Sequence, residues 1–257
     1  MNGHKYGVRY HMRPVGARNM STFMDTTPPD APTTYDKTNG NPQFQMLGNG
    51  PDPTLTVNHG NPVGDCGFVM TVNDEYINAC ETGESFTMPP ANEVVSDYLR
   101  YNHGVDRGVV NAQLFNYWHT VGLPWAGRLV GAAGVNHQDW DESWAYMYAF
   151  GGGCIAVAVT EAMEEQSARG DAWDITGTAA DYNVLGGHDV YVFARQDADT
   201  GVLATWGKPQ LFTRRWWLNY VQELDVTVTD RQVERRGNGY GVDLAQLEAY
   251  ADHLAAA

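Results

Sequence analysis

The hydrophobic pattern of this chain changes its period near residue 153, and this change restricts the possible folds more than any other feature. Before it, four segments place apolar side chains at helical spacing, and glycine ends three of them. These segments are 66–80, 91–104, 109–122 and 139–152. After it, short apolar or alternating runs predict strands. Helices first and strands second favour an α+β fold over one in which the two alternate.

Several strand segments and a terminal helix follow the change. Residues 154–160 are apolar and rich in β-branched side chains, which predicts a buried strand. Segments 188–196 and 201–207 alternate around a turn and predict a β-hairpin, while 224–234 predicts a further strand. Residues 242–257 predict a helix. The second half therefore builds a mainly antiparallel sheet.

The first 60 residues are rich in proline, glycine, asparagine and threonine. This composition predicts an extended arm over the body or a partly disordered tail. No internal repeat and no strong linker divides the rest of the chain. We therefore expect an extended N-terminal arm at 1–45, one α+β domain at 46–236 and a C-terminal helical tail at 237–257.

Composition excludes several classes of function. The net charge is −15, from 31 acidic and 16 basic residues, and a field of this sign repels nucleic-acid phosphates. No apolar run is long enough to span a membrane, and the basic start lacks the apolar core of a secretory signal. We therefore expect no nucleic-acid partner, no membrane partner and no secretion by a signal peptide.

The three cysteines, Cys66, Cys80 and Cys154, are too few and too scattered for a disulfide framework. No spacing typical of a zinc site occurs, so we expect no metal and no cofactor. Reduced thiols in a cytosol-like compartment are the simplest interpretation, and one of them is a candidate nucleophile.

Cys66 is the strongest candidate nucleophile, because it stands at the predicted start of a helix after Gly64 and Asp65. Asp65 is expected to cap that helix, and a helix N-terminus stabilises negative charge and so favours the thiolate. A buried cysteine that happens to begin a helix is the alternative. His188, after two glycines at the head of a predicted strand, is the candidate general base. Trp206, on the next strand, is a candidate to shield that histidine from water.

Six short motifs occur along the chain in a distinctive order. They are MLGN at 46–49, GDC at 64–66, LFNYWHTVG at 114–122, YAFGGG at 148–153, GGH at 186–188 and TWG at 205–207. Their order resembles that of papain-like cysteine peptidases, and especially of papain-like proteins encoded by tailed bacteriophages. The resemblance covers about residues 45–230. It implies a papain-like fold with a helical N-terminal half, headed by the Cys66 helix, and an antiparallel C-terminal half.

The same resemblance implies that Cys66 and His188 form the catalytic pair, but one position departs from the family pattern. The asparagine that orients the catalytic histidine in the family falls on Ala204, whose side chain makes no hydrogen bond. Asn183 and Asp189 are candidate substitutes, although strand alternation turns Asp189 away from its neighbour.

The oxyanion donor departs from the family as well, because the family's glutamine before the cysteine is missing. Asn49 and Asn61 are the candidates, alongside the backbone N–H of Cys66. The insertion at 50–63 separates Asn49 from Cys66 and leaves the choice between them open.

These observations favour a bacteriophage-encoded cysteine hydrolase, a peptidase or amidase that acts on a peptide or protein substrate. We expect it in the host cytoplasm during infection, with association to the virion as a further option. The alternative is a catalytically idle papain-fold protein of the virion, in capsid decoration or the tail, whose partners are other virion proteins. Ala204 and the N-terminal arm suit this alternative, whereas the Cys66–His188 pair favours the enzyme.

Two further possibilities follow from the sequence. An arm lying in the cleft, as a propeptide does, would make the chain a latent enzyme. The aromatic segment 214–220 is either core with a rim or an interaction surface, since tryptophan and arginine are frequent at interfaces.

Overall fold

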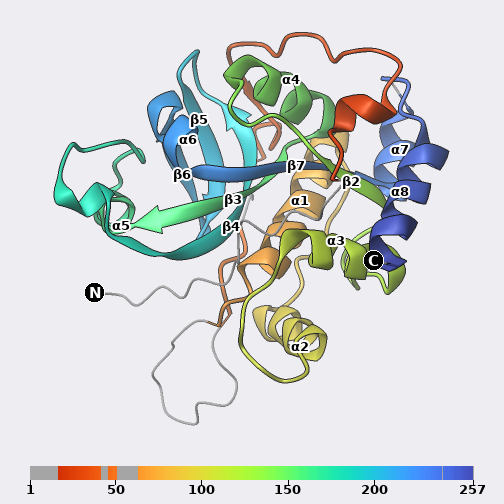
Figure 1. Ribbon diagram of the computed structural model, residues 1–257, viewed down its shortest axis with the longest axis horizontal. Coiled ribbons are helices and arrows are strands. Elements are labelled where there is room, and N and C mark those ends of the chain that lie inside the picture. Colours follow the sequence, from red (N-terminus) through yellow and green to blue (C-terminus); the bar gives the residue numbers. More distant parts are fainter. Residues whose placement is uncertain (1–16, 42–45, 51–62, 239, 257) are drawn as a thin grey trace.

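The structure is a computed structural model that describes residues 17–41, 46–50, 63–238 and 240–256. Its described part contains one antiparallel sheet in the order β2-β7-β3-β4-β5-β6, and β1 pairs with β4 (Figure 1). The strands are β1 Tyr35–Asp36, β2 Leu129–Gly134, β3 Gly153–Thr160, β4 Val184–Arg195, β5 Thr200–Thr205, β6 Lys208–Thr213 and β7 Val221–Thr229.

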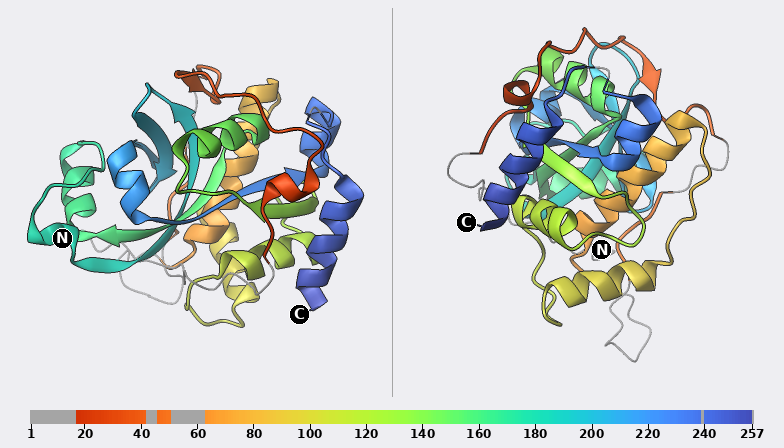
Figure 2. Two further views of the ribbon diagram at one scale, coloured as in Figure 1. Left: turned by 45° about the horizontal axis from the view of Figure 1, so that its top comes forward. Right: turned by 90° about the vertical axis from the view of Figure 1, so that its right-hand side faces the viewer.

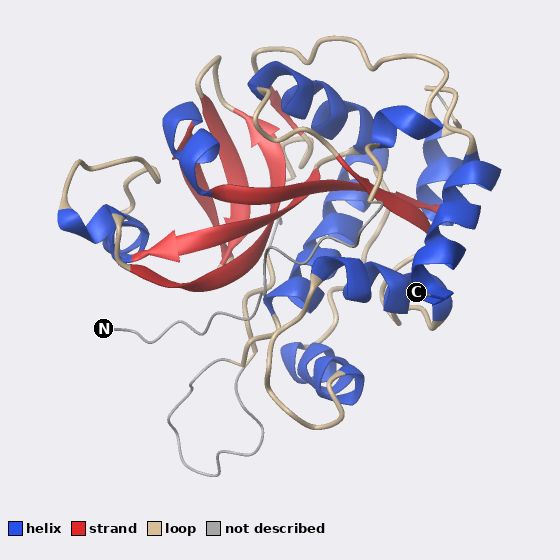
Figure 3. Ribbon diagram, viewed as in Figure 1, coloured by secondary structure: helices blue, strands red, loops and turns tan. Residues whose placement is uncertain are grey.

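Helices surround this sheet, as the colouring by secondary structure makes clear (Figure 3). They are α1 Cys66–Thr82, α2 Ala91–Tyr101, α3 Asn111–Thr120, α4 Trp140–Phe150, α5 Glu161–Arg169, α6 Arg214–Tyr220, α7 Asp230–Arg236 and α8 Leu244–Ala256, with short 3₁₀ turns at Met20–Phe23 and Ala179–Asp181. The expected combination of helices with an antiparallel sheet is confirmed.

Two apolar clusters lie on opposite faces of the sheet. One contains Ile155 and Val157 of β3 with the tryptophans of α4 and α6, and the other contains Cys154 of β3 with α1, α2 and α3. Since successive side chains of a strand point to opposite faces, β3 supplies both clusters and is buried along its whole length. This burial on two sides explains why its sequence is uniformly apolar rather than alternating.

Helix α1 crosses one face of the sheet and is buried along most of its length (Figures 1 and 2). Its first residue, Cys66, lies against β4, and farther along the helix Asp74 accepts a hydrogen bond from Thr227 of β7 at 2.8 Å. Small side chains at Cys154 and Ala156 of β3 lie on that face and let the helix approach closely. The sheet therefore fixes where α1 begins.

The N-terminal arm and the C-terminal tail both pack against the domain in their described parts. Met20 and Phe23 are buried in the core, and β1 pairs with the end of β4. Helix α8 packs against α3 and β2, and the Leu247 side chain covers Gly131. The boundaries expected for these segments, 1–45 and 237–257, stay predictions.

The strand expected at 224–234 is wrong in its second half. Strand β7 ends at Thr229, and α7 begins at Asp230. Thr229 and Gln232 form a reciprocal capping box, in which each side chain bonds the backbone of the other residue. The capping box begins a helix at this point, whereas the alternating pattern alone predicted that the strand continues.

Other elements were not expected from the sequence. Strands β2 and β6 carry glycines, alanines or a proline, which weaken a strand pattern, yet pairing within the sheet holds them in place. The acidic run at 161–166 belongs to α5. In α6, Trp216 and Trp217 are fully buried, so segment 214–220 contributes core rather than an exposed aromatic surface.

In the described part of the chain, no helix combines the length and the apolar character needed to cross a membrane.

A glycine at position 67 is required by the contact of α1 with its neighbours. A Cβ atom there would lie 2.5 Å from Val109, 2.9 Å from the Asp189 carboxyl and 3.1 Å from Leu114. Alanine normally stabilises a helix relative to glycine by about 1 kcal/mol. We expect Gly67→Ala to lower the free energy of unfolding instead, by about 1–3 kcal/mol, because of overpacking.

Urea unfolding monitored by circular dichroism checks this prediction. Asn92→Ala, at an exposed position of α2, raises helix propensity without a clash and serves as the control. A stabilised Gly67→Ala variant would show that the approach of α1 to β4 is looser than described.

Candidate active site

Cys66 is the first residue of α1 and is only 1% exposed. Its Sγ atom accepts a hydrogen bond from the backbone N–H of Asp189, with a sulfur–nitrogen distance of 3.4 Å. The turn before the helix is held by the backbone N–H of Gly64, which donates to the Asp106 carboxylate at 3.0 Å. The thiol therefore lies at a helix N-terminus and contacts β4 at Asp189, the residue that follows His188.

Asp65 occupies the N-cap position of α1, but the expected side-chain cap is wrong: its carboxyl bonds no amide of the helix. It accepts a hydrogen bond from the backbone N–H of Gly50 at 3.2 Å instead, and Asn49 lies beside it. Burial raises the pKa of Asp65 to about 7. Its role is to tie the Asn49–Gly50 segment to the start of the helix.

His188 lies in β4, opposite Val157 of β3, and is 1% exposed. Its Nε2 atom lies 2.8 Å from the hydroxyl oxygen of Thr205, at the end of β5. The indole of Trp206 stacks on the imidazole, with ring centroids 5.3 Å apart and planes inclined by 18°. The Trp206 ring thus covers one face of the imidazole, and its shielding role stays a prediction.

Trp206 and Gly207 form the tight turn between β5 and β6, and both have positive φ, 48° and 75°. Two positive φ values are typical of a type I′ hairpin turn, which non-glycine residues seldom adopt. Gly48 packs on this turn: a Cβ there would lie 2.8 Å from the Gly207 backbone nitrogen. The left-handed backbone of Trp206 places its ring over His188.

Thr205 is the site residue that sequence reasoning missed. Ala204, where the resemblance places the family's asparagine, pairs with Tyr191 and faces the cluster around α1. Thr205, one residue later, points to the opposite face of the sheet and reaches His188. Because side chains alternate along a strand, the sequence indicated that Thr205 lies on the opposite face of β5 from Ala204.

The remaining candidates lie in several places. The Asn183 amide donates to the Glu161 carboxylate at 3.0 Å. Asn183 directly precedes β4 and lies five positions before His188 in the sequence. Asn49 lies near the start of α1, and its amide donates to the Val63 carbonyl at 3.0 Å. Asn61 lies outside the described residues. The structure thus brings together Cys66, His188, Trp206 and Asn49, but not Asn183.

Asp189 turns away from His188, as strand alternation predicts. Its carboxyl lies on the α1 side of the sheet, where Gly67 leaves room for it. Burial, together with the charges of Glu223 and Asp225, raises the pKa of Asp189 well above its ordinary value.

The other two cysteines are also buried, and burial raises the pKa of each. Within the described ranges, no group of three histidine, cysteine or acidic side chains is arranged to hold a metal ion.

The raised pKa of Asp65 makes stability depend on pH. Its folded value is about 7 and its ordinary value is 3.8, so between these the folded chain binds a proton that the unfolded chain releases. Stability therefore falls as pH rises through this window, by about 1.4 kcal/mol per pH unit for one proton.

We expect Asp65→Asn to make the decline in unfolding free energy between pH 5 and pH 7 shallower by about that slope. Urea unfolding at several pH values measures it. Asp30→Asn, a change at an exposed aspartate, is the control and should leave the slope unchanged. Equal slopes in wild type and Asp65→Asn would contradict the raised pKa.

Comparison with known proteins relates this geometry to a fold. No protein-family model matches the chain, and no curated protein sequence matches it. Xylellain, a cysteine protease from Xylella fastidiosa, is similar in structure, with a TM-score of 0.64 and 13% identity over 87% of this chain and 96% of that one. Digestive procathepsin L 3 of Tenebrio molitor larval midgut has a TM-score of 0.53 and 11% identity over 80% and 72%. The chain therefore has the fold of papain-like cysteine proteases.

Proposed function

We propose that this chain is a cysteine hydrolase, a peptidase or amidase, in which Cys66 is the nucleophile and His188 carries the proton. The observation that carries the proposal is the contact of Cys66 Sγ with the Asp189 N–H, which seats the thiol beside His188. A cysteine at a helix N-terminus next to a fixed histidine is the arrangement that activates a thiol.

The reaction follows from these positions. Nε2 of His188 is engaged by Thr205, so Nδ1 is the ring atom that takes the thiol proton. The Cys66 thiolate attacks the substrate carbonyl carbon, and the imidazolium returns its proton to the leaving amine as the C–N bond breaks. Water, deprotonated by the same imidazole, then hydrolyses the thioester and releases the thiol.

The N-terminus of α1 stabilises the negative charge in both steps. The dipole of a long helix favours a thiolate at its first residue, and the Asp189 N–H donates to the sulfur as well. The backbone N–H of Cys66 and the side-chain amide of Asn49 are the proposed donors to the oxyanion. Asn61 remains a second candidate for the side-chain donor.

Thr205 and Trp206 hold the imidazole in this role. When the ring carries two protons, Nε2–H donates to the Thr205 oxygen, which supports the charged form. The stacked Trp206 ring fixes the plane of the imidazole and covers one of its faces. Thr205 thus supplies the hydrogen bond that Ala204 cannot.

One observation favours the idle virion protein or the latent enzyme as the second candidate. Cys66 and His188 are each 1% exposed, so a substrate reaches them only after part of the surrounding structure moves. An origin in a tailed bacteriophage and a place in the virion remain predictions from the sequence motifs.

Alkylation of Cys66 by iodoacetamide across pH tests the hydrolase. We expect Cys66 to react well below pH 8.5, the pKa of a free thiol, and His188→Ala to remove this low-pH reaction. Mass spectrometry of the modified peptide separates Cys66 from Cys80 and Cys154, whose pKa values are raised by burial and which are internal controls. A Cys66 that reacts only near pH 8.5, with no effect of His188→Ala, would leave the idle protein as the better interpretation.

Thr205→Val tests the positioning of His188, because it removes the hydroxyl and keeps the shape. We expect the rate of Cys66 alkylation at pH 6 to fall by roughly ten- to a hundredfold, since the imidazolium loses its hydrogen bond. Thr205→Ser should restore most of the rate, and the pH profile should return with it. Thr200→Val, on the same strand but away from the histidine, is the control. Equal rates in Thr205→Val and wild type would show that Trp206 alone suffices.

A further inference from the structure

The loop between α2 and α3 contacts the start of α1 at two points, one on each side of Cys66. Before the cysteine, the backbone N–H of Gly64 donates a hydrogen bond to the Asp106 carboxyl at 3.0 Å. After it, Val109 lies so close to Gly67 that a Cβ atom on the glycine would approach its side chain to 2.5 Å. The loop therefore restrains the chain on both sides of the thiol.

Tyr98 of α2 fixes the shape of this loop. Its hydroxyl donates to the Asp106 carboxyl at 2.6 Å, on the same oxygen that accepts from the turn before α1, and it accepts from the backbone N–H of Gly108 at 2.8 Å. Its fully buried ring meets the Phe68 ring of α1 edge-on, with centroids 5.8 Å apart. Burial, the hydrogen bond to Asp106 and the charges of Asp106 and Cys66 raise the pKa of Tyr98 well above its ordinary value. The hydroxyl therefore keeps the proton that it donates.

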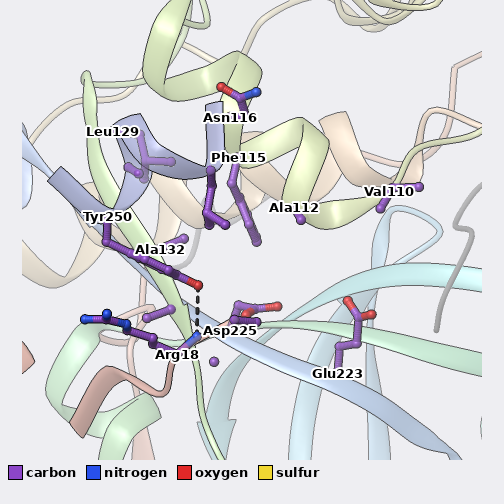
Figure 4. Close-up of a pocket in the computed structure, with 15 residues that line it drawn as sticks. Arg18, Val110, Ala112, Phe115, Asn116, Leu129, Ala132, Glu223, Asp225 and Tyr250 are labelled. Carbon is purple, nitrogen blue, oxygen red and sulfur yellow. Dashed lines mark hydrogen bonds between the residues drawn. The ribbon is translucent and has the colours of Figure 1, made fainter. Parts of the chain in front are cut away.

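Apolar packing alone does not hold the end of the loop. Val110 borders a cavity between α3, β2 and α8, to which Ala112 and Phe115 of α3 also contribute (Figure 4). Residues beside a cavity lack packing partners on that side, so their positions depend more on hydrogen bonds. The bonds of Asp106 and Tyr98 supply this restraint.

The position of Gly64 matters to the proposed reaction because this residue lies two positions before Cys66. The backbone N–H of Cys66 is a proposed oxyanion donor, and the thiol has to stay within reach of His188 to share its proton. A displacement of about 1 Å in a reacting group can cost about a hundredfold in rate. Whatever holds the turn before α1 therefore affects both functions of Cys66.

We propose that Asp106 and Tyr98 are positioning residues for Cys66, a hydrogen-bonded pair that holds the turn before α1 and so keeps the thiol in place for the reaction. The proposal rests on the hydrolase proposed above and adds two residues to its site. Both act through the backbone of Gly64. Helix α2, which lies apart from the sheet in Figure 1, takes part in the site through this contact.

Alkylation of Cys66 by iodoacetamide in the full chain tests the pair. The readout is the rate at pH 6 divided by the rate at pH 9, because a change in access to the buried thiol alters both rates alike. We expect Asp106→Ala to lower this ratio by roughly ten- to a hundredfold, since a displaced thiol loses the imidazolium that favours its ionisation. Asp106→Asn keeps the acceptor oxygen and should stay within about threefold of wild type.

Tyr98→Phe removes only the hydroxyl and leaves the bond between Asp106 and Gly64. We expect it to lower the ratio by about three- to tenfold, and it serves as the test if Asp106→Ala does not fold. The double variant should match Asp106→Ala alone, because Tyr98 acts through Asp106.

Thr227→Val is the matched control. It also removes a buried hydrogen bond of α1, the one to Asp74 at 2.8 Å, but farther along the helix from Cys66. It should lower the midpoint of urea unfolding and leave the ratio of rates unchanged. Circular dichroism confirms that each variant is folded.

Each other outcome has a definite meaning. A wild-type ratio in both Asp106→Ala and Tyr98→Phe overturns the positioning role and leaves the hydrolase standing. Equal losses in Asp106→Ala and Thr227→Val show that the ratio follows stability, and they overturn the role as well. A wild-type Cys66 that reacts only near pH 8.5, with no effect of His188→Ala, overturns the proposed function itself.

Discussion

The contact between the first turn of α1 and the middle of β4 is the constraint on which the rest of this structure depends. Cys66 Sγ accepts from the Asp189 N–H, and Gly67 lies so close to Val109 and Asp189 that no side chain fits. Because the helix begins at that contact, one interaction places the thiol beside His188 and brings the first turn of α1 against Leu114 of α3.

Burying α1 in this way brings carboxylates into the interior. Asp65 and Asp74 both have pKa values raised to about 7 by burial, and each binds hydroxyl or amide donors rather than a salt-bridge partner at short range. Such groups cost stability when ionised, so they persist where they hold a particular arrangement. Asp65 holds the Asn49–Gly50 segment at the helix start, and Asp74 holds the helix to β7.

The histidine is oriented by a different residue from the one the family pattern suggests. An orienting group needs only an oxygen within hydrogen-bond distance of Nε2, and the direction from which it comes is open. Position 204 and Thr205 lie on opposite faces of β5, so the hydrogen bond to His188 comes from a different face than the family pattern suggests. The turn at Trp206 places a ring over the same histidine. The proposed pair therefore does not require the asparagine whose absence argued against it.

The sequence alone determined the helices of the first half, the hairpin around Asp197–Thr200 and the candidacy of Cys66 and His188, because these depend on local period and short motifs. It did not determine β2, β6 or α5, whose patterns are weak and whose stability comes from neighbours. It also missed Thr205. The contact of Thr205 with His188 arises from strand register, which joins residues far apart in the chain and exists only once the sheet has formed.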